Sequence, residues 1–318
     1  MPSPFPLLRL PRLVLFEVFK SLSIGEKIEL SLCSTQISTQ INNAQFYSQK
    51  VIVCLDILTR KIKVHSENNK DTFDIFMYPD LWRSHNSNTH QLSIARGTVP
   101  VIPHTKGISA FWKNDREEYL SAIRYLLKMF QCKISINMKH YSSGLYGATI
   151  SMLFDLQVEF KKLSISLNGS EDQNLLWNQI SNKLGLVEDL RITSTFNTDF
   201  IPVFTSWPQN ITITRSHWFT LKSLLACSCT TITLPWSHLE NEDLDEILKN
   251  WKAGGFLNLK NLRVESQRIT NNGTTILGMS LSELDGKDIQ TNDGLRKATI
   301  NTGFQMFQMF FQMLIYSR

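Results

Sequence analysis

The chain has 318 residues, enough for one large domain or two modest domains with a buried core. Hydrophobic residues make up 42% and charged residues 19% of the sequence, which is a globular composition and excludes an intrinsically disordered protein. The formal net charge of +5 comes without a long run of basic residues, so we expect no nucleic-acid partner.

Cysteine usage and hydropathy indicate where the chain functions. Its five cysteines are odd in number, scattered and without a CxxC pair, which is typical of reduced thiols. Prolines interrupt the N-terminal segment, and no small-residue cleavage site follows it. No apolar run reaches the ~20 residues that span a bilayer. We therefore expect a protein of the cytoplasm, the nucleus or both, without membrane contact.

The first predicted elements are two short helices. Leu10-Pro11 precedes the first helix, and proline is tolerated in a first helical turn. Gly25 is predicted to break this helix before the second one begins. The apolar positions are Leu13, Phe16, Val18, Phe19 and Leu22 in the first helix and Ile28, Leu30 and Leu32 in the second. Because these positions lie on nearly every side, the helices need cover from the rest of the chain or from a partner protein.

A β-rich connecting segment follows at residues 51–114. The runs VIVCLDI, KIKVH and TFDIFMY predict a small meander of strands. Residues 79–114 are rich in Ser, Asn, His, Gly and Pro, and we predict mostly loop there, around strands near QLSIA and TVPVI.

Residues 115–318 alternate between strand and helix patterns. Several strand patterns carry two apolar residues separated by one position, and these pairs recur roughly every 20–30 residues. The pairs are Ile134/Ile136, Leu163/Ile165, Leu190/Ile192, Ile211/Ile213, Ile232/Leu234 and Leu262/Val264. The period predicts an irregular, leucine-rich-repeat-like solenoid, in which each unit buries its apolar face against the next. The asparagine ladder of a regular repeat is absent, and an ordinary α/β domain with parallel strands is the alternative.

Helical patterns surround these strands at residues 115–130, 170–184, 216–226 and 240–251. Asp115 and Glu118 are the predicted capping pair of the first. The C-terminal segment GFQMFQMFFQML carries glutamines at helical spacing, which predicts an amphipathic helix. A strand that closes the solenoid is the alternative, because Phe is a strand former and terminal repeats need a cap. In either form we expect a cap and not a free tail.

No pattern in the sequence predicts catalysis or a cofactor. The common nucleotide-binding, hydrolase and zinc-protease motifs are absent. The histidines include no i, i+4 pair, and Cys227 and Cys229 offer only half of a tetrahedral metal site; buried helix-end cysteines are the simpler interpretation. The acidic run at residues 240–246 is explained by the start of a helix. We predict no enzyme, no metal and no cofactor.

The first fifty residues resemble the F-box. Leu-Pro followed by an apolar helix, a short polar break and a second apolar helix is the pattern of that module. The matching residues are Leu10, Pro11, Val14, Leu15, Val18, Phe19 and Leu22, then Ile28, Leu30 and Leu32, with Glu26 as the acidic residue at the second helix start. The segments SENNKDTFDIFMYP, CKISINMKHYSS and LKNWKAGGFLNLKNLRV resemble the F-box-associated type 2 region of a nematode-expanded F-box family.

This resemblance implies an α/β protein with an all-α F-box at residues 1–50, the connecting segment at 51–114 and an F-box-associated type 2 domain at 115–318. It also implies a substrate-recognition adaptor of an SCF-type cullin-RING ubiquitin ligase. The F-box would bind the Skp-type linker protein and the C-terminal domain an unknown protein target. The linker contacts implied by motif position are Leu10, Pro11, Val14, Val18, Leu22 and Ile28, although any of these, and especially Leu15 and Phe19, could pack inside the F-box instead. A non-ligase binding scaffold with a degenerate F-box is the alternative.

Side-chain alternation along the strands predicts where a target binds. If the paired apolar residues face the core, the residue between them faces outward. These residues are Ser135, Ser164, Arg191, Thr212, Thr233 and Arg263. Two arginines among hydroxyl groups suit a hydrogen-bonding surface with arginine anchors. A merely solvated face is the alternative, and the 79–114 loops would then be the target surface.

Overall fold

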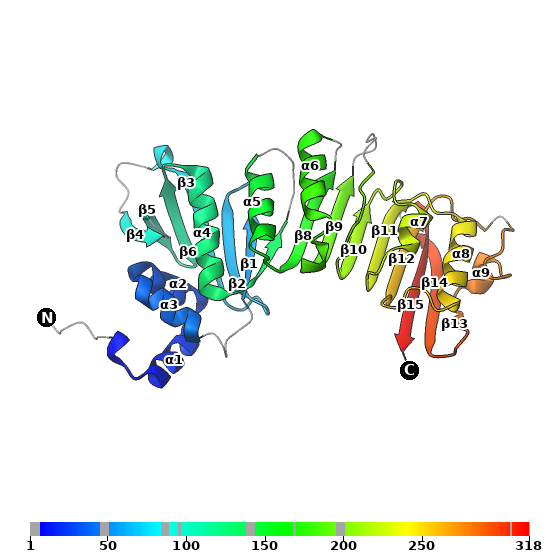
Figure 1. Cartoon of the computed structure of the whole chain (residues 1–318), viewed down its shortest axis with the longest axis horizontal. Helices are drawn as coiled ribbons and strands as arrows, with labels where there is room; N and C mark the ends of the chain where they lie inside the picture. The colour runs from blue at the N-terminus through cyan, green and yellow to red at the C-terminus, as the bar shows by residue number, and fades with distance from the viewer. Residues whose placement is uncertain are drawn as a thin grey trace. The chain divides into compact units, whose positions relative to one another are not determined.

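The computed structural model describes residues 7–44, 51–83, 89–94, 97–137, 144–167, 170–194, 201–271, 273–305 and 307–317. The chain divides into two compact units, and both contain helices and strands (Figure 1). The first unit comprises Met1–Leu153 and Val158–Lys161, and the second comprises Phe154–Gln157 and Lys162–Arg318. The fold is therefore mixed α/β, with helices at the N-terminus followed by sheet, as the sequence predicted.

The N-terminal helices are η1 Leu7–Arg9, α1 Arg12–Ser21, α2 Ile24–Cys33 and α3 Thr35–Ala44. A capping box starts α2: the Ser23 hydroxyl accepts the Glu26 N–H, and the Glu26 carboxylate accepts the Ser23 N–H at 2.8 Å. The break between α1 and α2 therefore falls at residues 22–23. Our expectation that Gly25 breaks the helix was wrong, because Gly25 lies in the first turn of α2.

Gly25 allows α2 to pack closely on the sheet of the first unit. A Cβ at this position would lie 2.8 Å from the Phe73 ring. Next to it, the Ile24 N–H donates to the Asp71 carboxylate at 2.7 Å, which joins the start of α2 to the segment before β3. The helix α3 was not predicted, because its sequence is polar except at Ile37, Ile41 and Ala44; the structure buries Ile41 and Ala44.

The strands of the first unit lie in the order β7-β1-β2-β3-β6-β5-β4. Their bounds are β1 Val51–Asp56, β2 Lys61–Ser66, β3 Thr72–Pro79, β4 His90–Ile94, β5 Gly97–His104, β6 Gly107–Trp112 and β7 Lys133–Ile136, with η3 Asp80–Trp82 after β3. The antiparallel meander β1-β2-β3 and the strands β4 and β5 confirm the predictions for these segments. The predicted loop was wrong at β6, a short apolar run that is buried throughout and pairs with β3 and β5.

The helix α4 Asp115–Phe130 has the bounds that its pattern predicted. Its N-cap is Asn114, whose N–H donates to the Glu118 carboxylate at 2.9 Å. Glu118 is therefore part of the cap as predicted, whereas Asp115 is not the cap residue. The helix packs on α3 and on strands β1 and β3, and α5 Gly144–Asp155 follows β7.

The strands of the second unit lie in the order β8-β9-β10-β11-β12-β15-β14-β13. Their bounds are β8 Phe160–Leu167, β9 Val187–Ser194, β10 Asn210–Thr214, β11 Thr231–Ser237, β12 Asn261–Ser266, β13 Asp288–Gln290, β14 Arg296–Gln305 and β15 Gln308–Ser317. Strands β9 to β12 are parallel and in register. All the predicted apolar pairs, including the pair on β7, lie on strands and are buried.

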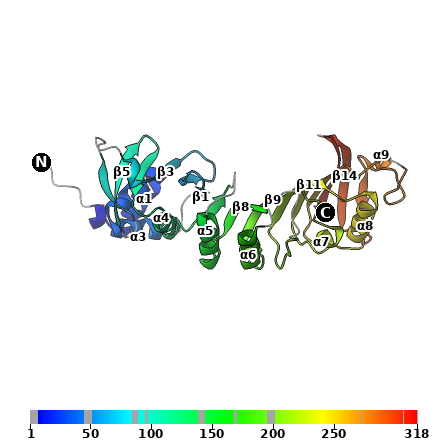
Figure 2. The same ribbon diagram turned by 90° about the horizontal axis from the view of Figure 1, so that it is seen from above.

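The helices α6 Glu171–Ile180, α7 Leu221–Leu225 and α8 Asn241–Lys252 lie on one side of these strands (Figure 2), with η4 Leu184–Leu186 before β9 and α9 Leu281–Leu284 before β13. The predicted helix at 216–226 was too long. Ser216 lies before α7 instead: its N–H and hydroxyl both donate to the Pro235 carbonyl on β11, and its own carbonyl accepts the Phe219 N–H in a turn. Parallel strands with intervening helices occur in solenoids and in ordinary α/β domains alike, so the solenoid interpretation stays a prediction.

The C-terminal segment forms the end of β14 and most of β15, so the predicted amphipathic helix was wrong. Strand β15 pairs antiparallel with β12 on one side and with β14 on the other. Phe311 and Met313 are buried while Gln312 between them faces outward, which is the period of a strand. The segment forms a strand because β12 would otherwise end the sheet with unpaired N–H and C=O groups. Pairing with a strand satisfies these backbone groups, whereas a helix would not. The segment covers the end of the parallel run, as the alternative prediction stated.

Candidate functional site

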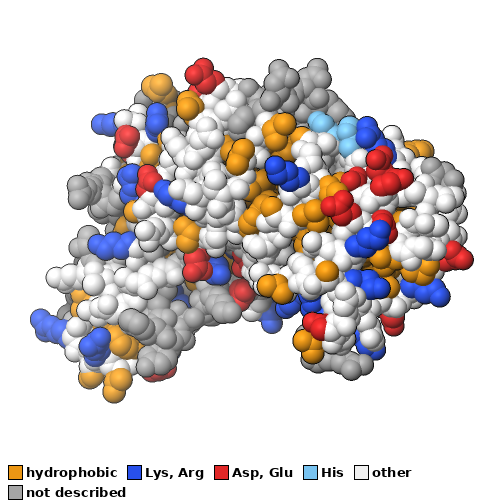
Figure 3. Space-filling view, turned by 45° about the vertical axis from the view of Figure 1, so that its right-hand side comes forward, with side chains coloured by type: hydrophobic (Ala, Val, Ile, Leu, Met, Phe, Trp, Pro, Cys, Tyr) orange, Lys and Arg blue, Asp and Glu red, His pale blue; other side chains and the backbone are white. Residues whose placement is uncertain are grey.

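The first candidate site is an apolar surface on and around α1. Leu13 is 80% exposed and Val14 is 46% exposed, which is unusual for large aliphatic side chains in one helical turn. Figure 3 shows hydrophobic side chains gathered at its lower left, at the height of α1 in Figure 1. We define the α1 surface by seven residues that are each exposed or half-buried: Leu8, Leu10, Pro11, Leu13, Val14, Val18 and Leu22.

The opposite side of α1 is part of the core. Leu15 and Phe19 lie four residues apart on one helical face and are buried, as the F-box pattern allowed. Ile28, which the motif position assigned to linker contact, is 0% exposed. Its side chain fills the core beneath α2, so we leave Ile28 out of the α1 surface. The structure thus leaves five of the six implied contact residues accessible.

A groove of about 690 Å³ opens beside the α1 surface. One side comes from residues 8–15 and consists of three leucines and one arginine, whereas the other side is polar and comes from α3. Its lining residues are Leu8, Leu10, Arg12 and Leu15 on the first side and Gln36, Thr39, Gln40 and Asn43 on the second. A partner segment that enters this groove would meet aliphatic side chains and hydrogen-bonding amides together.

The second candidate site is the face of the second unit's sheet opposite the described helices α6, α7 and α8 (Figure 2). Here Arg191 on β9 is in register with Thr212 on β10, Thr212 with Thr233 on β11, and Thr233 with Arg263 on β12. The apolar residues on either side of each of these positions are buried, so the four side chains share the outer face. We call this face the open face.

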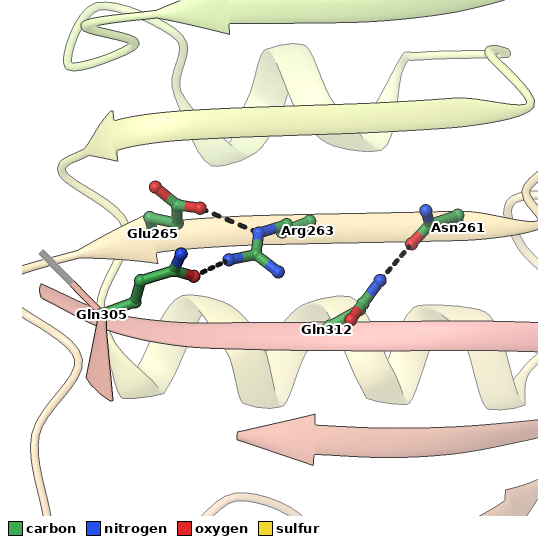
Figure 4. Close-up of polar contacts among 5 residues, drawn as sticks. All are labelled: Asn261, Arg263, Glu265, Gln305 and Gln312. Carbon is green, nitrogen blue, oxygen red and sulfur yellow. Dashed lines mark hydrogen bonds and ion pairs between the residues drawn. The ribbon is translucent and has the colours of Figure 1, made fainter. Parts of the chain in front are cut away.

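Arg263 is held in place by three neighbours on the open face, of which Glu265 and Gln305 are drawn in Figure 4. Its Nε donates to the Glu265 carboxylate at 2.8 Å, and its Nη2 donates to the Gln305 side-chain oxygen at 2.6 Å. Its guanidinium carbon lies 4.8 Å from the centre of the Phe310 ring. Gly303 makes room for that ring, because a Cβ there would lie 2.7 Å from it. The result is a half-buried arginine, 25% exposed, with a fixed orientation.

Arg191 is held more loosely. Its side chain is 53% exposed, and its Nε donates to the Asp189 carboxylate at 3.3 Å. Ser164 lies on β8, next to β9 in the strand order, and is half-buried. Ser135 lies on β7 in the first unit and is buried, so the structure does not group it with the open face.

The C-terminal hairpin extends the open face beyond the predicted residues. Gln312 on β15 is in register with Arg263, and Asn301 on β14 is in register with Gln312. The Gln312 amide also donates to the Asn261 side-chain oxygen at 3.3 Å, as Figure 4 shows. The sequence analysis missed these residues because it predicted a helical tail, which would not place them on the sheet. The alternation of glutamine with apolar Phe and Met in the sequence was the signal that could have predicted the strand.

The remaining candidates do not form a chemical site. Within the described ranges, no three side chains of His, Cys, Asp or Glu come together as a metal site. Cys227 and Cys229 are buried as expected, and the hydrogen bond that the Cys229 thiol makes to Cys227, together with burial, raises the pKa of that thiol. The rings of His217 and His238 lie 5.5 Å apart, a proximity that the sequence did not predict. None of the described helices is long and apolar enough to cross a membrane.

Two domain models match the chain. One, described as F-box domain, matches residues 7–49 and covers α1, α2 and α3. The other, described as F-box associated, matches residues 199–264 and includes Thr212, Thr233 and Arg263 of the open face. No curated protein and no solved structure gives a significant match. The chain therefore contains an N-terminal F-box domain and a C-terminal F-box-associated domain, as its motifs predicted.

Proposed function

We propose that the chain is a substrate-recognition adaptor of an SCF-type cullin-RING ubiquitin ligase. F-box domains generally bind Skp-type linker proteins in such ligases, and F-box-associated families are adaptor-like and not catalytic. In this proposal the α1 surface binds the linker and the open face binds a protein target.

The exposed aliphatic turn of α1 is the observation that carries the proposal. Leu13 and Val14 expose apolar area inside the matched F-box domain although buried positions exist on the same helix. A partner protein that covers them would gain hydrophobic free energy of about 25 cal/mol for each Å² removed from water. Pro11, Val18 and Leu22 continue this surface. Apolar centres of this kind are where binding energy concentrates in protein interfaces.

Co-expression with a Skp-type linker protein tests the ligase part of the proposal. We expect the two full chains to elute together in size-exclusion chromatography and the complex to recruit a cullin. Elution of the full chain without the linker would instead support a binding scaffold with a degenerate F-box.

Charge reversal on the open face tests the target part. We expect Arg191→Glu together with Arg263→Glu to remove bound proteins other than the linker from a pull-down, while the linker stays bound. Lys222→Glu on α7 makes the same type of charge change on the helix side and should leave the bound proteins unchanged. Unchanged partners in the arginine double variant would move the target surface away from the open face.

A further inference from the structure

The two arginines of the open face lie at a separation that restricts what can bind both. Arg191 is on β9 and Arg263 is on β12, with Thr212 and Thr233 at the register positions between them. Neighbouring strands lie about 4.8 Å apart, so three strand spacings separate the two arginine backbones by about 14 Å. A ligand that reaches both must cross the strands along this line.

An extended peptide that crosses the strands has a matching period. It rises about 3.4 Å per residue and points alternate side chains to opposite faces, so residues i and i+4 face the same side about 14 Å apart. Residues i and i+2 are about 7 Å apart and residues i and i+6 about 20 Å apart. Among the same-side spacings, a four-residue separation alone places one side chain over each arginine.

The chemistry of the two ends favours carboxylates. A guanidinium has five N–H donors and matches a carboxylate in shape and charge. The described side-chain hydrogen bonds use one donor of Arg191, to Asp189, and two donors of Arg263, to Glu265 and Gln305. Donors therefore remain on both guanidinium groups for an incoming ligand.

The middle of the line accepts an uncharged peptide segment. Thr212 and Thr233 are half-buried, and their small side chains let a ligand approach the sheet closely. Threonine hydroxyls both donate and accept hydrogen bonds, so they suit the N–H and C=O groups of a peptide backbone. Neither threonine carries a charge that could pair with a charged residue at the centre of the ligand.

We propose that the open face binds an extended acidic segment with two carboxylates four residues apart, of the form Asp/Glu-x-x-x-Asp/Glu. One carboxylate pairs with Arg191 and the other with Arg263, and the residue midway between them lies over the threonines. This inference rests on the proposed target-binding role of the open face, and it names the chemical class of the target.

The two anchors contribute unequally. Arg263 is already fixed by Glu265, Gln305 and the Phe310 ring, so it loses little conformational freedom when a ligand binds. A lysine at this position would keep the charge but lose the planar fork and the ring contact. Arg263→Lys should therefore weaken binding more than Arg191→Lys does at the exposed position.

A panel of peptides tests the spacing on the full chain. Each fluorescein-labelled peptide is built from Gly, Ser and Thr and carries two glutamates. The second glutamate stands at i+2, i+4, i+6 or i+8 relative to the first, and a peptide with one glutamate is the reference. By fluorescence anisotropy at low salt, we expect the four-residue separation to bind about tenfold more tightly than the others, the effect of one additional charge-assisted hydrogen bond. Arg191→Glu or Arg263→Glu should abolish this preference, and the control variant Lys222→Glu should retain it.

Equal binding of every separation would overturn the inference, as would binding of an oligonucleotide or heparin with no dependence on peptide spacing. Failure to bind any peptide would also overturn it. The pull-down with the double arginine variant keeps the two proposals distinct: lost partners combined with no spacing preference would leave the open face as the target surface but refute the acidic segment.

Discussion

The α1 surface and the open face distribute polar and apolar side chains in opposite ways. The helix buries Leu15 and Phe19 but also exposes Leu13 and Val14, so apolar residues lie on both of its sides. The strands of the open face bury every apolar pair and present threonine, arginine and amides outward. An exposed apolar surface is stable in water chiefly when a partner covers it, whereas a polar face is stable alone. The first surface therefore suits a lasting partner and the second an exchangeable one.

Removal of the C-terminal strand should have the largest effect, because the open face depends on it. Deletion of residues 304–318 takes away the buried Phe311 and Met313 and leaves β12 with an unpaired edge. Truncation of one such side chain costs about 2–5 kcal/mol, so we expect the loss of both with the strand to exceed about 4 kcal/mol. Thermal unfolding should show a much lower melting temperature, and solubility should fall because the exposed edge can pair with other chains.

A shorter deletion is the control for this experiment. Removal of residues 316–318 keeps Phe311, Met313 and all the paired positions between β15 and β12, so the melting temperature should change little. If the long deletion melts at the wild-type temperature, β15 does not stabilise the second unit.

Charge in the α1 surface should have the next largest effect, on binding and not on stability. Val14→Asp with Val18→Asp places two charges where the proposal puts an apolar interface. An unpaired buried charge costs on the order of 3 kcal/mol or more, so affinity for the linker should fall by more than about a hundredfold. Biolayer interferometry with immobilised linker measures this change.

Leu81→Asp is the matched control, since Leu81 is an exposed aliphatic residue elsewhere in the first unit. It should leave the affinity for the linker unchanged. Wild-type affinity in the Val14/Val18 double variant would refute the assignment of the α1 surface to the linker.

Two residues of the F-box motif allow a sharper comparison within one domain. Ile28→Ala removes a buried side chain and should lower the free energy of unfolding by about 2–5 kcal/mol. Val14→Ala removes exposed atoms and should change it by less than about 0.5 kcal/mol. Urea titrations of both variants measure the difference; equal losses would mean that both positions are buried in solution.

Much of this arrangement could be predicted from local pattern. The apolar pairs on β8 to β12 were recognisable because a strand with one buried face alternates strictly. The bounds of α4, and those of α8 to within one residue, followed from helical periodicity and from acidic residues at their starts. The likeness of the first fifty residues to an F-box came from the same kind of local spacing.

Other features depended on neighbours that no local pattern reveals. Ile28 and Val14 both read as apolar motif positions, and only the packing of α2 on the sheet separates the buried one from the exposed one. The tail became a strand because the edge of β12 was available to it. A buried serine ends β9 and another lies just beyond β10; the Ser194 hydroxyl donates to the Arg215 carbonyl and the Ser216 hydroxyl to the Pro235 carbonyl. Arg215, in the left-handed conformation, adds one residue before Ser216. The two serines therefore do not follow their strands at a constant spacing, and the sequence alone does not reveal that they are equivalent.

The smallest expected effect concerns pH and the second unit. His238 lies beside His217 at 5.5 Å, and its pKa is lowered from its ordinary value by partial burial, then by the charge of Arg268 and by His217. The folded state therefore binds a proton at His238 less readily than the unfolded state does. The resulting stability is present above the ordinary histidine pKa of about 6.5 and is lost as pH falls through the lowered value. His238→Gln should make the unfolding free energy less dependent on pH between neutrality and mild acid, as urea titrations at several pH values would show. Arg268→Gln should have a smaller effect in the same direction, and none when His238 is already replaced. A wild-type pH dependence in His238→Gln would show that this part of the polar surface does not contribute to stability through protonation.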